Sequence, residues 1–169
     1  MSEKRLFFAL WPDERQRETL RNTMSPIVRS VEGRAVYRGN WHVTLVFVGS
    51  FPADRADELL AAAAEVAVEP FRLRFDRLAH WQRPKIACLQ AMSVPAALGQ
   101  LVNDLNDVIA RFDVAPESGT YRPHITAVRN ARPFEAMMLA RPLELSWSSF
   151  ELVESVSTRE GVQYHPLKQ

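Results

Sequence analysis

The chain has 169 residues, of which 47% are apolar, and its 21 Lys and Arg side chains nearly balance 20 Asp and Glu. The ordinary apolar fraction and the net charge of +1 exclude an intrinsically disordered chain and a protein that coats nucleic acid. No apolar run approaches the ~18 residues of a membrane span. The single cysteine, Cys88, excludes an internal disulfide and a multi-cysteine metal cage.

The cations are unequal, with 18 arginines and only 3 lysines. The planar guanidinium suits phosphate, so a local phosphate site is one interpretation, and genomic codon bias is the other. Residues 1–16 reach acidic side chains too early for a signal peptide, which predicts a cytoplasmic protein. Without a linker or low-complexity tract, we expect residues 1–169 to form a single domain.

The first half of the chain predicts strands alternating with helices. Residues 5–11 are dense in large apolar side chains and stop at Pro12, which is typical of a buried strand. Residues 42–48 are rich in β-branched side chains and close on Gly49, which indicates a second strand. Three further elements complete this half: helices over 13–28 and 54–68, and a short strand over 34–38.

The second half repeats this alternation. Residues 71–75 alternate between apolar and basic side chains, as a half-buried strand does. Residues 95–112 form the clearest predicted helix, because apolar side chains recur at helical spacing from Leu98 to Phe112. Four further strands are expected: over 85–92, over 123–128, in the alternating stretches of 143–156, and over 162–167.

One short strand is written twice, once in each half. Residues 41–45 read Trp-His-Val-Thr-Leu, and residues 123–127 read Pro-His-Ile-Thr-Ala. Two of the four histidines, His42 and His124, are thus followed at the second position by a threonine, Thr44 or Thr126. No glycine-rich phosphate loop follows any predicted strand.

The spacing of this motif favours catalysis. In a strand, residues i and i+2 point to the same face, so each histidine projects together with its threonine. An imidazole titrates near pH ~6.5, so one histidine can serve as general base while the other serves as general acid. Threonine hydroxyls can donate hydrogen bonds to phosphoryl oxygens. The alternative is a pair of structural histidines in ordinary strands.

Other residues are weaker candidates. Arg129, five residues after His124, can clamp a phosphate, or it is a solvated strand-end arginine. Phe8 and Trp41 can stack on a base, or they fill the core, and Trp81 shares this ambiguity. Three other side chains with catalytic chemistry are expected to be structural: His80, His165 and Cys88.

The two motifs resemble those of the two-histidine (2H) phosphoesterases, and more specifically of the RNA 2′,3′-cyclic phosphodiesterases, also called LigT-type or 2′-5′ RNA ligases. Residues 40–49, NWHVTLVFVG, are similar to the family's N-L-H-L-T-L-x-F-L-G, and residues 121–129, YRPHITAVR, to its Y-x-P-H-I-T-L-A-R. Trp41 replaces a usual Leu, and Ala127-Val128 replaces Leu-Ala. The likeness covers nearly the whole chain, from the opening strand to the closing ones.

The resemblance implies an α+β fold of two pseudo-symmetric lobes, with antiparallel sheets lining a central cleft and helices outside. It also implies hydrolysis of RNA 2′,3′-cyclic phosphate ends to 2′-phosphates without a metal or other cofactor, with a minor reverse ligase activity. His42 is then the proton donor and His124 the proton acceptor. Thr44, Thr126 and Arg129 hold the phosphate. We expect a monomer.

Two alternatives stay open on the sequence. A 2H enzyme of this kind can act on a small cyclic nucleotide, such as ADP-ribose 1″,2″-cyclic phosphate, because the motif contacts the phosphate and not the rest of the substrate. A non-catalytic RNA-end binder is the second alternative, and the intact His and Thr of both motifs argue against it.

Overall fold

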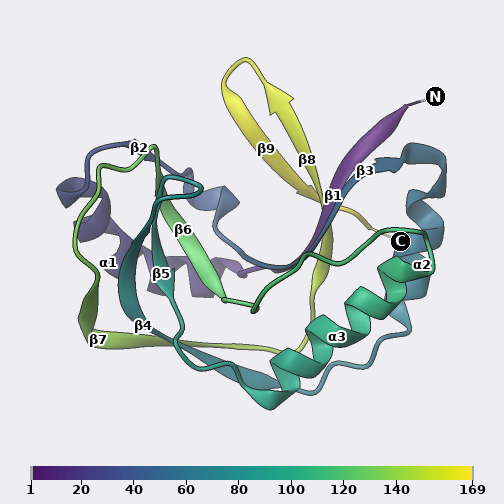
Figure 1. The fold of residues 1–169 in the computed structure, drawn as a ribbon. Coiled ribbons are helices and arrows are strands. Elements are labelled where there is room, and N and C mark those ends of the chain that lie inside the picture. Colours follow the sequence, from purple (N-terminus) through teal and green to yellow (C-terminus); the bar gives the residue numbers. More distant parts are fainter. Residues whose placement is uncertain (1, 169) are drawn as a thin grey trace.

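A computed structural model describes residues 2–168 as two antiparallel sheets with three α-helices (Figure 1). This confirms the predicted α+β class. The helices are α1 (Glu14–Ser30), α2 (Ala56–Ala64) and α3 (Ala96–Ala110). The strands are β1 (Glu3–Leu10), β2 (Arg34–Ala35), β3 (Val43–Pro52), β4 (Phe71–Trp81), β5 (Ile86–Gln90), β6 (His124–Arg129), β7 (Met137–Trp147), β8 (Glu151–Thr158) and β9 (Gly161–Pro166).

The two histidine motifs lie in different sheets. The first sheet has the strand order β3-β1-β8-β9, and the second has the order β2-β6-β5-β4-β7. β3 carries the first motif and β6 carries the second, and these two strands contact each other where the sheets meet. A bond from the Tyr121 hydroxyl to the carbonyl oxygen of Thr44, at 2.8 Å, joins the second motif to the first.

Each half of the chain contributes to both sheets. β2 leaves the first half to pair with β6, whereas β8 and β9 leave the second half to extend the sheet of β1 and β3. The helices are exchanged too. α1 follows β1 but packs on β6 and β7, and α3 follows β5 but packs on β3 and α2 (Figure 1).

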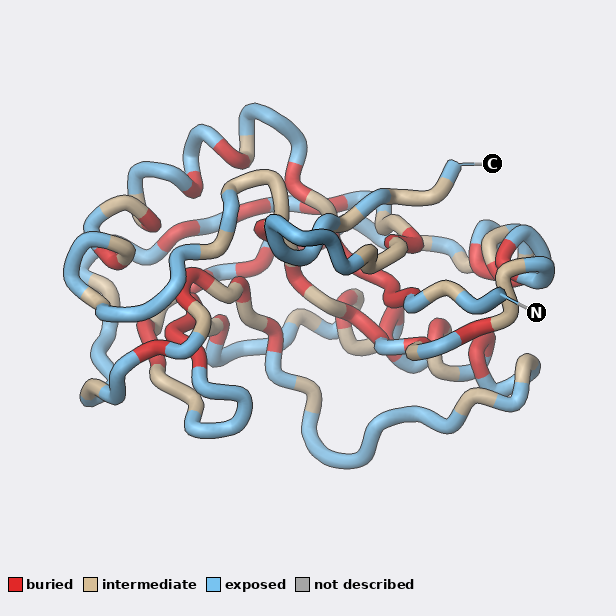
Figure 2. Tube along the Cα trace, turned by 90° about the horizontal axis from the view of Figure 1, so that it is seen from above, coloured by how far each residue is buried: buried red, intermediate tan, exposed pale blue. Residues whose placement is uncertain are grey.

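The core is continuous between the sheets and the helices. β1 contributes Leu6, Phe8 and Leu10 to it, whereas Phe7 and Ala9 are buried on the opposite face of the strand. Apolar side chains of α1 and α3 pack against both sheets in the same cluster, so buried stretches recur along nearly every element (Figure 2). Burying a large side chain of this kind contributes about 1.5–3 kcal/mol each, which is why these segments fold together.

Three elements differ from their predicted bounds. The short strand predicted over 34–38 pairs only at Arg34 and Ala35, because the chain then turns through a 3-10 helix at Arg38–Asn40. The second helix ends at Ala64 and does not reach 68, since two β-branched valines and Pro70 follow. The stretch 143–156 is two strands, and the first of them begins at Met137.

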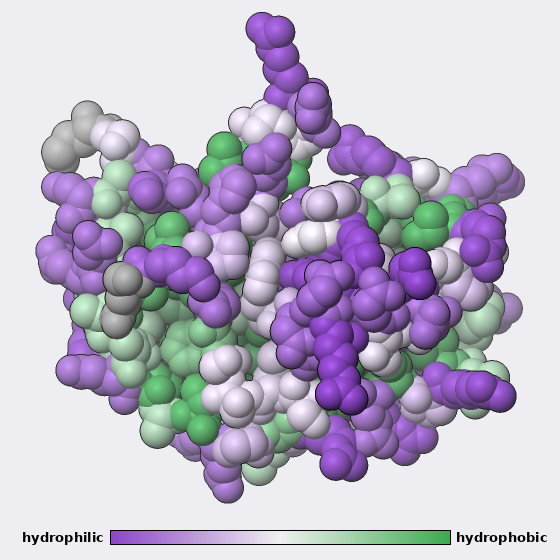
Figure 3. All heavy atoms as spheres, turned by 180° about the vertical axis from the view of Figure 1, so that it is seen from behind, coloured by the Kyte–Doolittle hydropathy of each residue, from purple (hydrophilic) through white to green (hydrophobic). Residues whose placement is uncertain are grey.

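The outer surface is mainly hydrophilic. Seen from behind, hydrophilic side chains cover much of the molecule, and apolar side chains show in patches between them (Figure 3). Among residues 2–168, no helix has the length and apolarity to cross a bilayer. Cys88 is fully buried in β5, and burial raises the pKa of its thiol to about 12, so it packs as a small apolar side chain, as predicted.

Candidate active site

Both motifs line one cavity between the two sheets. The cavity has a volume of about 530 Å³, and His42, Thr44, His124, Thr126 and Arg129 all face it. The five residues that the sequence singled out as catalytic or phosphate-binding are therefore brought together, although their two groups lie about eighty positions apart in the chain. Neither sheet alone provides this arrangement.

A β-bulge follows the threonine of the first motif. Thr44 pairs with Ala9 and Val46 pairs with Phe8, so Leu45 is an extra residue in β3. The extra residue reverses the alternation of side chains along the strand. Thr44 and Phe47 therefore face the cavity although they are three positions apart, and Leu45 and Val46 are both buried.

The second motif repeats this bulge. Thr126 pairs with Cys88 and Val128 pairs with Ala87, so Ala127 is the extra residue in β6. The bulge brings Arg129 to the cavity, five residues after His124, just as Phe47 stands five residues after His42. Residues at matching positions of the two motifs therefore have matching orientations.

Backbone carbonyls fix the tautomer of both histidines. His42 Nδ1 lies 2.8 Å from the carbonyl oxygen of Asn40, and His124 Nδ1 lies 2.9 Å from that of Arg122. A carbonyl only accepts hydrogen bonds, so each Nδ1 carries a proton and donates it. In the neutral ring, Nε2 is therefore the basic nitrogen. His42 Nε2 lies 2.9 Å from the Thr44 hydroxyl.

Burial keeps both imidazoles neutral in the unliganded protein. It lowers the pKa of His42 to about 4, because a charged ring loses its hydration there, and the bond to Asn40 only partly offsets this loss. The positive charges of Arg129 and Arg17 lower the pKa of His42 further, and so does His124 when it is protonated. Burial also lowers the pKa of His124, with nearby arginines adding to the effect. The sequence predicts one protonated and one neutral histidine at neutral pH, whereas the lowered pKa values favour the neutral form of both.

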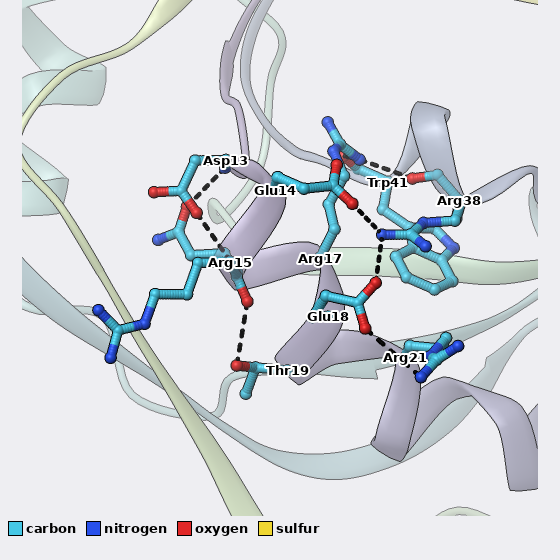
Figure 4. Close-up of polar contacts among 10 residues, drawn as sticks. Asp13, Glu14, Arg15, Arg17, Glu18, Thr19, Arg21, Arg38 and Trp41 are labelled. Atoms are coloured by element: carbon cyan, nitrogen blue, oxygen red, sulfur yellow. Dashed lines mark hydrogen bonds and ion pairs between the residues drawn. The ribbon is translucent and has the colours of Figure 1, made fainter.

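A buried arginine on α1 supports the loop before His42. Arg17 is 6% exposed, and its Nη1 donates to the carbonyl oxygens of Arg38, at 2.6 Å, and Trp41, at 3.2 Å (Figure 4). These two carbonyls flank Asn40, whose own carbonyl holds His42. The guanidinium also lies 5.1 Å from the centre of the Trp11 ring, which stacks on His42 with 6.0 Å between ring centres.

Ion pairs between Arg38 and α1 add a second set of contacts between this helix and the turn over residues 38–41. Arg38 Nη2 lies 2.6 Å from a carboxylate oxygen of Glu14 and 3.2 Å from one of Glu18, both on α1 (Figure 4). These side chains are half-buried or exposed, so each pair contributes little to stability, on the order of 0–1 kcal/mol. Their role is geometric, because they fasten the 38–41 turn to the helix that also holds Arg17.

An aromatic and a cationic side chain cover the other histidine. The Trp81 and His124 ring centres are 4.2 Å apart, and the Arg122 guanidinium lies 4.0 Å from the Trp81 ring centre. Trp81 therefore packs between Arg122 and His124 at the cavity wall. On the first sheet, Phe7 and Tyr164 surround His42, with ring centres 4.9 and 5.2 Å from its imidazole.

The cavity is positively charged. Four arginines line it, Arg5, Arg83, Arg122 and Arg129, against one carboxylate, Glu117. Within residues 2–168, none of these four arginines forms an ion pair with a carboxylate. Unpaired guanidinium groups suit a phosphate ligand. Over the same range, His, Cys, Asp and Glu nowhere gather in threes as a metal ion would need.

The predicted stacking residues are wrong. Phe8, in β1, is fully buried in the core. Trp41 also lies in the core and is only 5% exposed, so neither ring can contact a base. Two other aromatic side chains of these segments, Phe7 and Phe47, line the cavity instead, and Phe47 is 49% exposed. Period-two counting misses Phe47 because the bulge at Leu45 lies between it and Thr44. His80 bonds the Ala131 carbonyl at 3.0 Å, outside the cavity lining.

Comparison with known proteins gives the same fold and site class. The LigT like Phosphoesterase family model matches residues 10–88. The RNA 2′,3′-cyclic phosphodiesterase of Escherichia coli (strain K12) is 32% identical over 100% of this chain and 97% of that protein. The Aeropyrum pernix protein of the same name is 27% identical over 90% of each chain. A crystal structure of E. coli LigT complexed with 3′-AMP has a TM-score of 0.86 at 28% identity, covering 99% of this chain and 97% of that one.

Paired His–Thr strands facing each other across two antiparallel sheets define a two-histidine phosphoesterase, and the protein is an enzyme of that class. Within the class, the chain belongs to the family of LigT-like phosphoesterases.

Replacing the buried arginine should be visible in the titration of His42. In Arg17→Met, the 38–41 turn loses its two side-chain hydrogen bonds and the site loses one positive charge, so water and protons reach His42 more easily. We expect the pKa of His42 to rise from about 4 towards its ordinary value of 6.5, as followed by NMR of the imidazole. Arg29→Met, at an exposed position in the last turn of the same helix, is the control and leaves the titration unchanged. A wild-type titration in Arg17→Met would contradict this role.

Proposed function

We propose that the enzyme hydrolyses 2′,3′-cyclic phosphate ends of RNA to 2′-phosphomonoesters by acid–base catalysis between His42 and His124, without a metal. The observation that carries this proposal is the pair of tautomer-fixed histidines facing one arginine-lined cavity. Three relatives carry the name RNA 2′,3′-cyclic phosphodiesterase, and they match 90% or more of this chain, which supports the substrate class.

The reaction needs a base and an acid on opposite sides of phosphorus. Nε2 of His124 takes a proton from water while the water oxygen forms a bond to phosphorus. The bond from phosphorus to O3′ breaks, and Nε2 of His42 gives its proton to that oxygen. The products are a 2′-phosphate and a free 3′-hydroxyl. The location of the two motifs on different sheets supports the proposal that the two imidazoles lie on opposite sides of the phosphate.

Binding of the anionic substrate favours protonation of His42, the acid in this mechanism. His42 is neutral in the unliganded site, so it must gain a proton before it can act as the acid. A cyclic phosphate is an anion, and an opposite charge within a few ångströms favours the protonated imidazole. Arg129 and the hydroxyls of Thr44 and Thr126 would bind its non-bridging oxygens, where charge develops in the transition state. Binding would therefore prepare the site for reaction.

The same site fits the minor reverse reaction and a smaller substrate. In 2′-5′ ligation the 5′-hydroxyl of a second RNA takes the place of water. Its oxygen bonds to phosphorus as His124 takes its proton, and the bond to O3′ breaks as His42 protonates that oxygen. Water competes with this hydroxyl, so ligation is the minor activity. A cavity of about 530 Å³ holds a nucleotide, so a small cyclic nucleotide is the second candidate substrate. Structures of E. coli LigT with 3′-AMP and with NADP+ favour that candidate. We propose that the enzyme acts as a monomer, because both His-x-Thr motifs of the site belong to one chain.

Loss of either histidine should remove most of the activity. Acid–base groups contribute about 100- to 10,000-fold each, so we expect His42→Ala and His124→Ala to lower kcat by that order while the circular dichroism spectrum is retained. The assay is the conversion of the 2′,3′-cyclic phosphate end of an oligonucleotide to a 2′-phosphate end. His165→Ala, at an exposed position of β9, should retain wild-type rates. Wild-type rates in either motif variant would exclude this mechanism, and the absence of turnover in wild type would favour a non-catalytic RNA-end binder.

Chelation should leave the rate unchanged. The proposed steps use imidazoles, hydroxyls and a guanidinium, none of which needs a metal ion. We expect the same kcat/KM before and after dialysis against EDTA, measured on the same cyclic-phosphate oligonucleotide. Loss of activity that is restored by one divalent ion would contradict the proposal.

The position of the phosphate in the product tests the assignment of acid and base. If protonated His42 faces O3′, the product is the 2′-phosphate, and phosphorus NMR against 2′- and 3′-phosphate standards distinguishes the two. A product that is mainly 3′-phosphate would mean that the histidine roles, or the orientation of the substrate, are reversed.

A further inference from the structure

Two arginines lie on neighbouring strands at the margin of the catalytic cavity. Arg34, in the edge strand β2, pairs directly with Arg129 at the end of β6 (Figure 1). Directly opposed residues of an antiparallel pair project from the same face of the sheet, with Cβ atoms about 4.5–5.5 Å apart. Arg129 lines the cavity, whereas Arg34 is exposed and lies one strand further out. The positive charge of the cavity therefore continues beyond its wall, onto β2.

A close backbone contact holds β2 in this position. Gly33 precedes Arg34, and a Cβ atom at position 33 would lie 2.6 Å from Cγ1 of Val128 and 2.7 Å from the carbonyl oxygen of Arg129. Any other residue at position 33 would push β2 away from the end of β6. The amide of Val36 also donates to a carbonyl oxygen of β6, at 2.9 Å. The proximity of Arg34 to Arg129 is thus a fixed part of the fold.

The two positive charges lack an internal partner. Like charges at directly opposed positions destabilise a sheet. Within residues 2–168, neither Arg34 nor Arg129 forms an ion pair with a carboxylate. Glu32, the acidic residue nearest to Arg34 in the sequence, pairs with Arg132 instead, at 3.3 Å. A bound anion beside each guanidinium would relieve this repulsion, and a cyclic phosphate at Arg129 supplies only one negative charge.

We infer that Arg34 binds the phosphodiester that precedes the terminal nucleoside of an RNA strand, while the cyclic phosphate lies at Arg129. This inference rests on the proposed function, because it places the reacting phosphate between the histidines. A guanidinium group binds phosphate oxygens through two parallel hydrogen bonds, so two adjacent groups suit two successive phosphates of one strand. A cyclic mononucleotide has no second phosphate. Arg34 therefore selects an RNA end over a small cyclic nucleotide.

Binding of product analogues tests this site without relying on turnover. The probes are adenosine 2′-monophosphate and two dinucleotides of adenosine that end in a 2′-phosphate, titrated by calorimetry. One dinucleotide has a phosphodiester linkage, and the other has an uncharged methylphosphonate linkage. The ratio of their dissociation constants isolates the charge of the second phosphate, and the mononucleotide reports on the catalytic cavity alone.

The expected effect follows from the charge and exposure of Arg34. Hydrogen bonds to charged groups correspond to about 10- to 150-fold in affinity, and solvent screening at an exposed arginine favours the lower end. We expect the wild-type protein to bind the charged dinucleotide about 10-fold more tightly than the uncharged one. Arg34→Gln should bind the two equally, and Arg34→Lys should retain part of the difference, because it keeps the charge without the planar fork.

The control removes the same charge elsewhere. Arg15→Gln replaces an exposed arginine of α1 that does not line the cavity, and it should keep the wild-type ratio. A wild-type protein that binds both dinucleotides equally, or an unchanged ratio in Arg34→Gln, would overturn the proposal. An equal loss of affinity for all three probes in Arg34→Gln would overturn it too, since Arg34 would then act on the reacting phosphate. Failure of the proposed function is seen separately, as absence of turnover of a cyclic-phosphate oligonucleotide by the wild-type protein.

Discussion

The hydrogen bond from each histidine Nδ1 to the carbonyl two residues earlier is the contact on which the site depends. It fixes the tautomer, turns Nε2 towards the substrate and is made twice with nearly the same length. Because a backbone carbonyl cannot rotate independently, the two imidazoles are only as well placed as the turns that precede them. The turn before His42 accepts hydrogen bonds from Arg17. The segment before His124 includes Tyr121, whose hydroxyl donates to the carbonyl oxygen of Thr44 in the other motif. Burial then lowers the pKa values of both rings, and a nearby anion acts in the opposite direction, because it favours the protonated imidazole.

The two lobes share a backbone plan and differ in side chains. Both motif strands have a buried apolar residue after the histidine, a threonine towards the cavity and a one-residue bulge before the next cavity residue. A symmetric frame could bind a cyclic phosphate in either direction. Phe47 and Arg129 line the cavity at matching positions with different chemistry, so the two orientations of a substrate are not equivalent. The direction of substrate binding in turn decides which oxygen leaves.

Much of this could be predicted from the sequence, and the failures have a common cause. The duplicated His-x-Thr strands, the helical spacing of α3 and the buried strand over residues 5–11 are local patterns, and the structure confirms those elements. Phe8 was a candidate for base stacking, but β1 turns it into the core and its neighbour Phe7 towards His42. Arg17 looked like an ordinary helical arginine, since nothing in the sequence around it shows that a loop 20 residues later needs its donors. Three features depend on contacts between distant segments: the bulges, the hydrogen bonds of Arg17, and the direction in which each side chain of a buried strand points. Local periodicity in the sequence gives no information on such contacts.

The exchange of elements between the halves constrains how the protein can be divided. From the first half of the chain, β2 joins the sheet of β6 and α1 packs on that sheet. From the second half, β8 and β9 join the sheet of β1 and β3, and α3 packs on β3. A chain cut between α2 and β4 would therefore yield two incomplete fragments. The first would contain α1 without the sheet on which it packs, and the second would lack the edge strand β2 and the covering helix α1. Neither fragment contains a complete core, although each carries a complete motif. The two similar halves of the chain therefore form one folding unit, in which each half completes the core of the other.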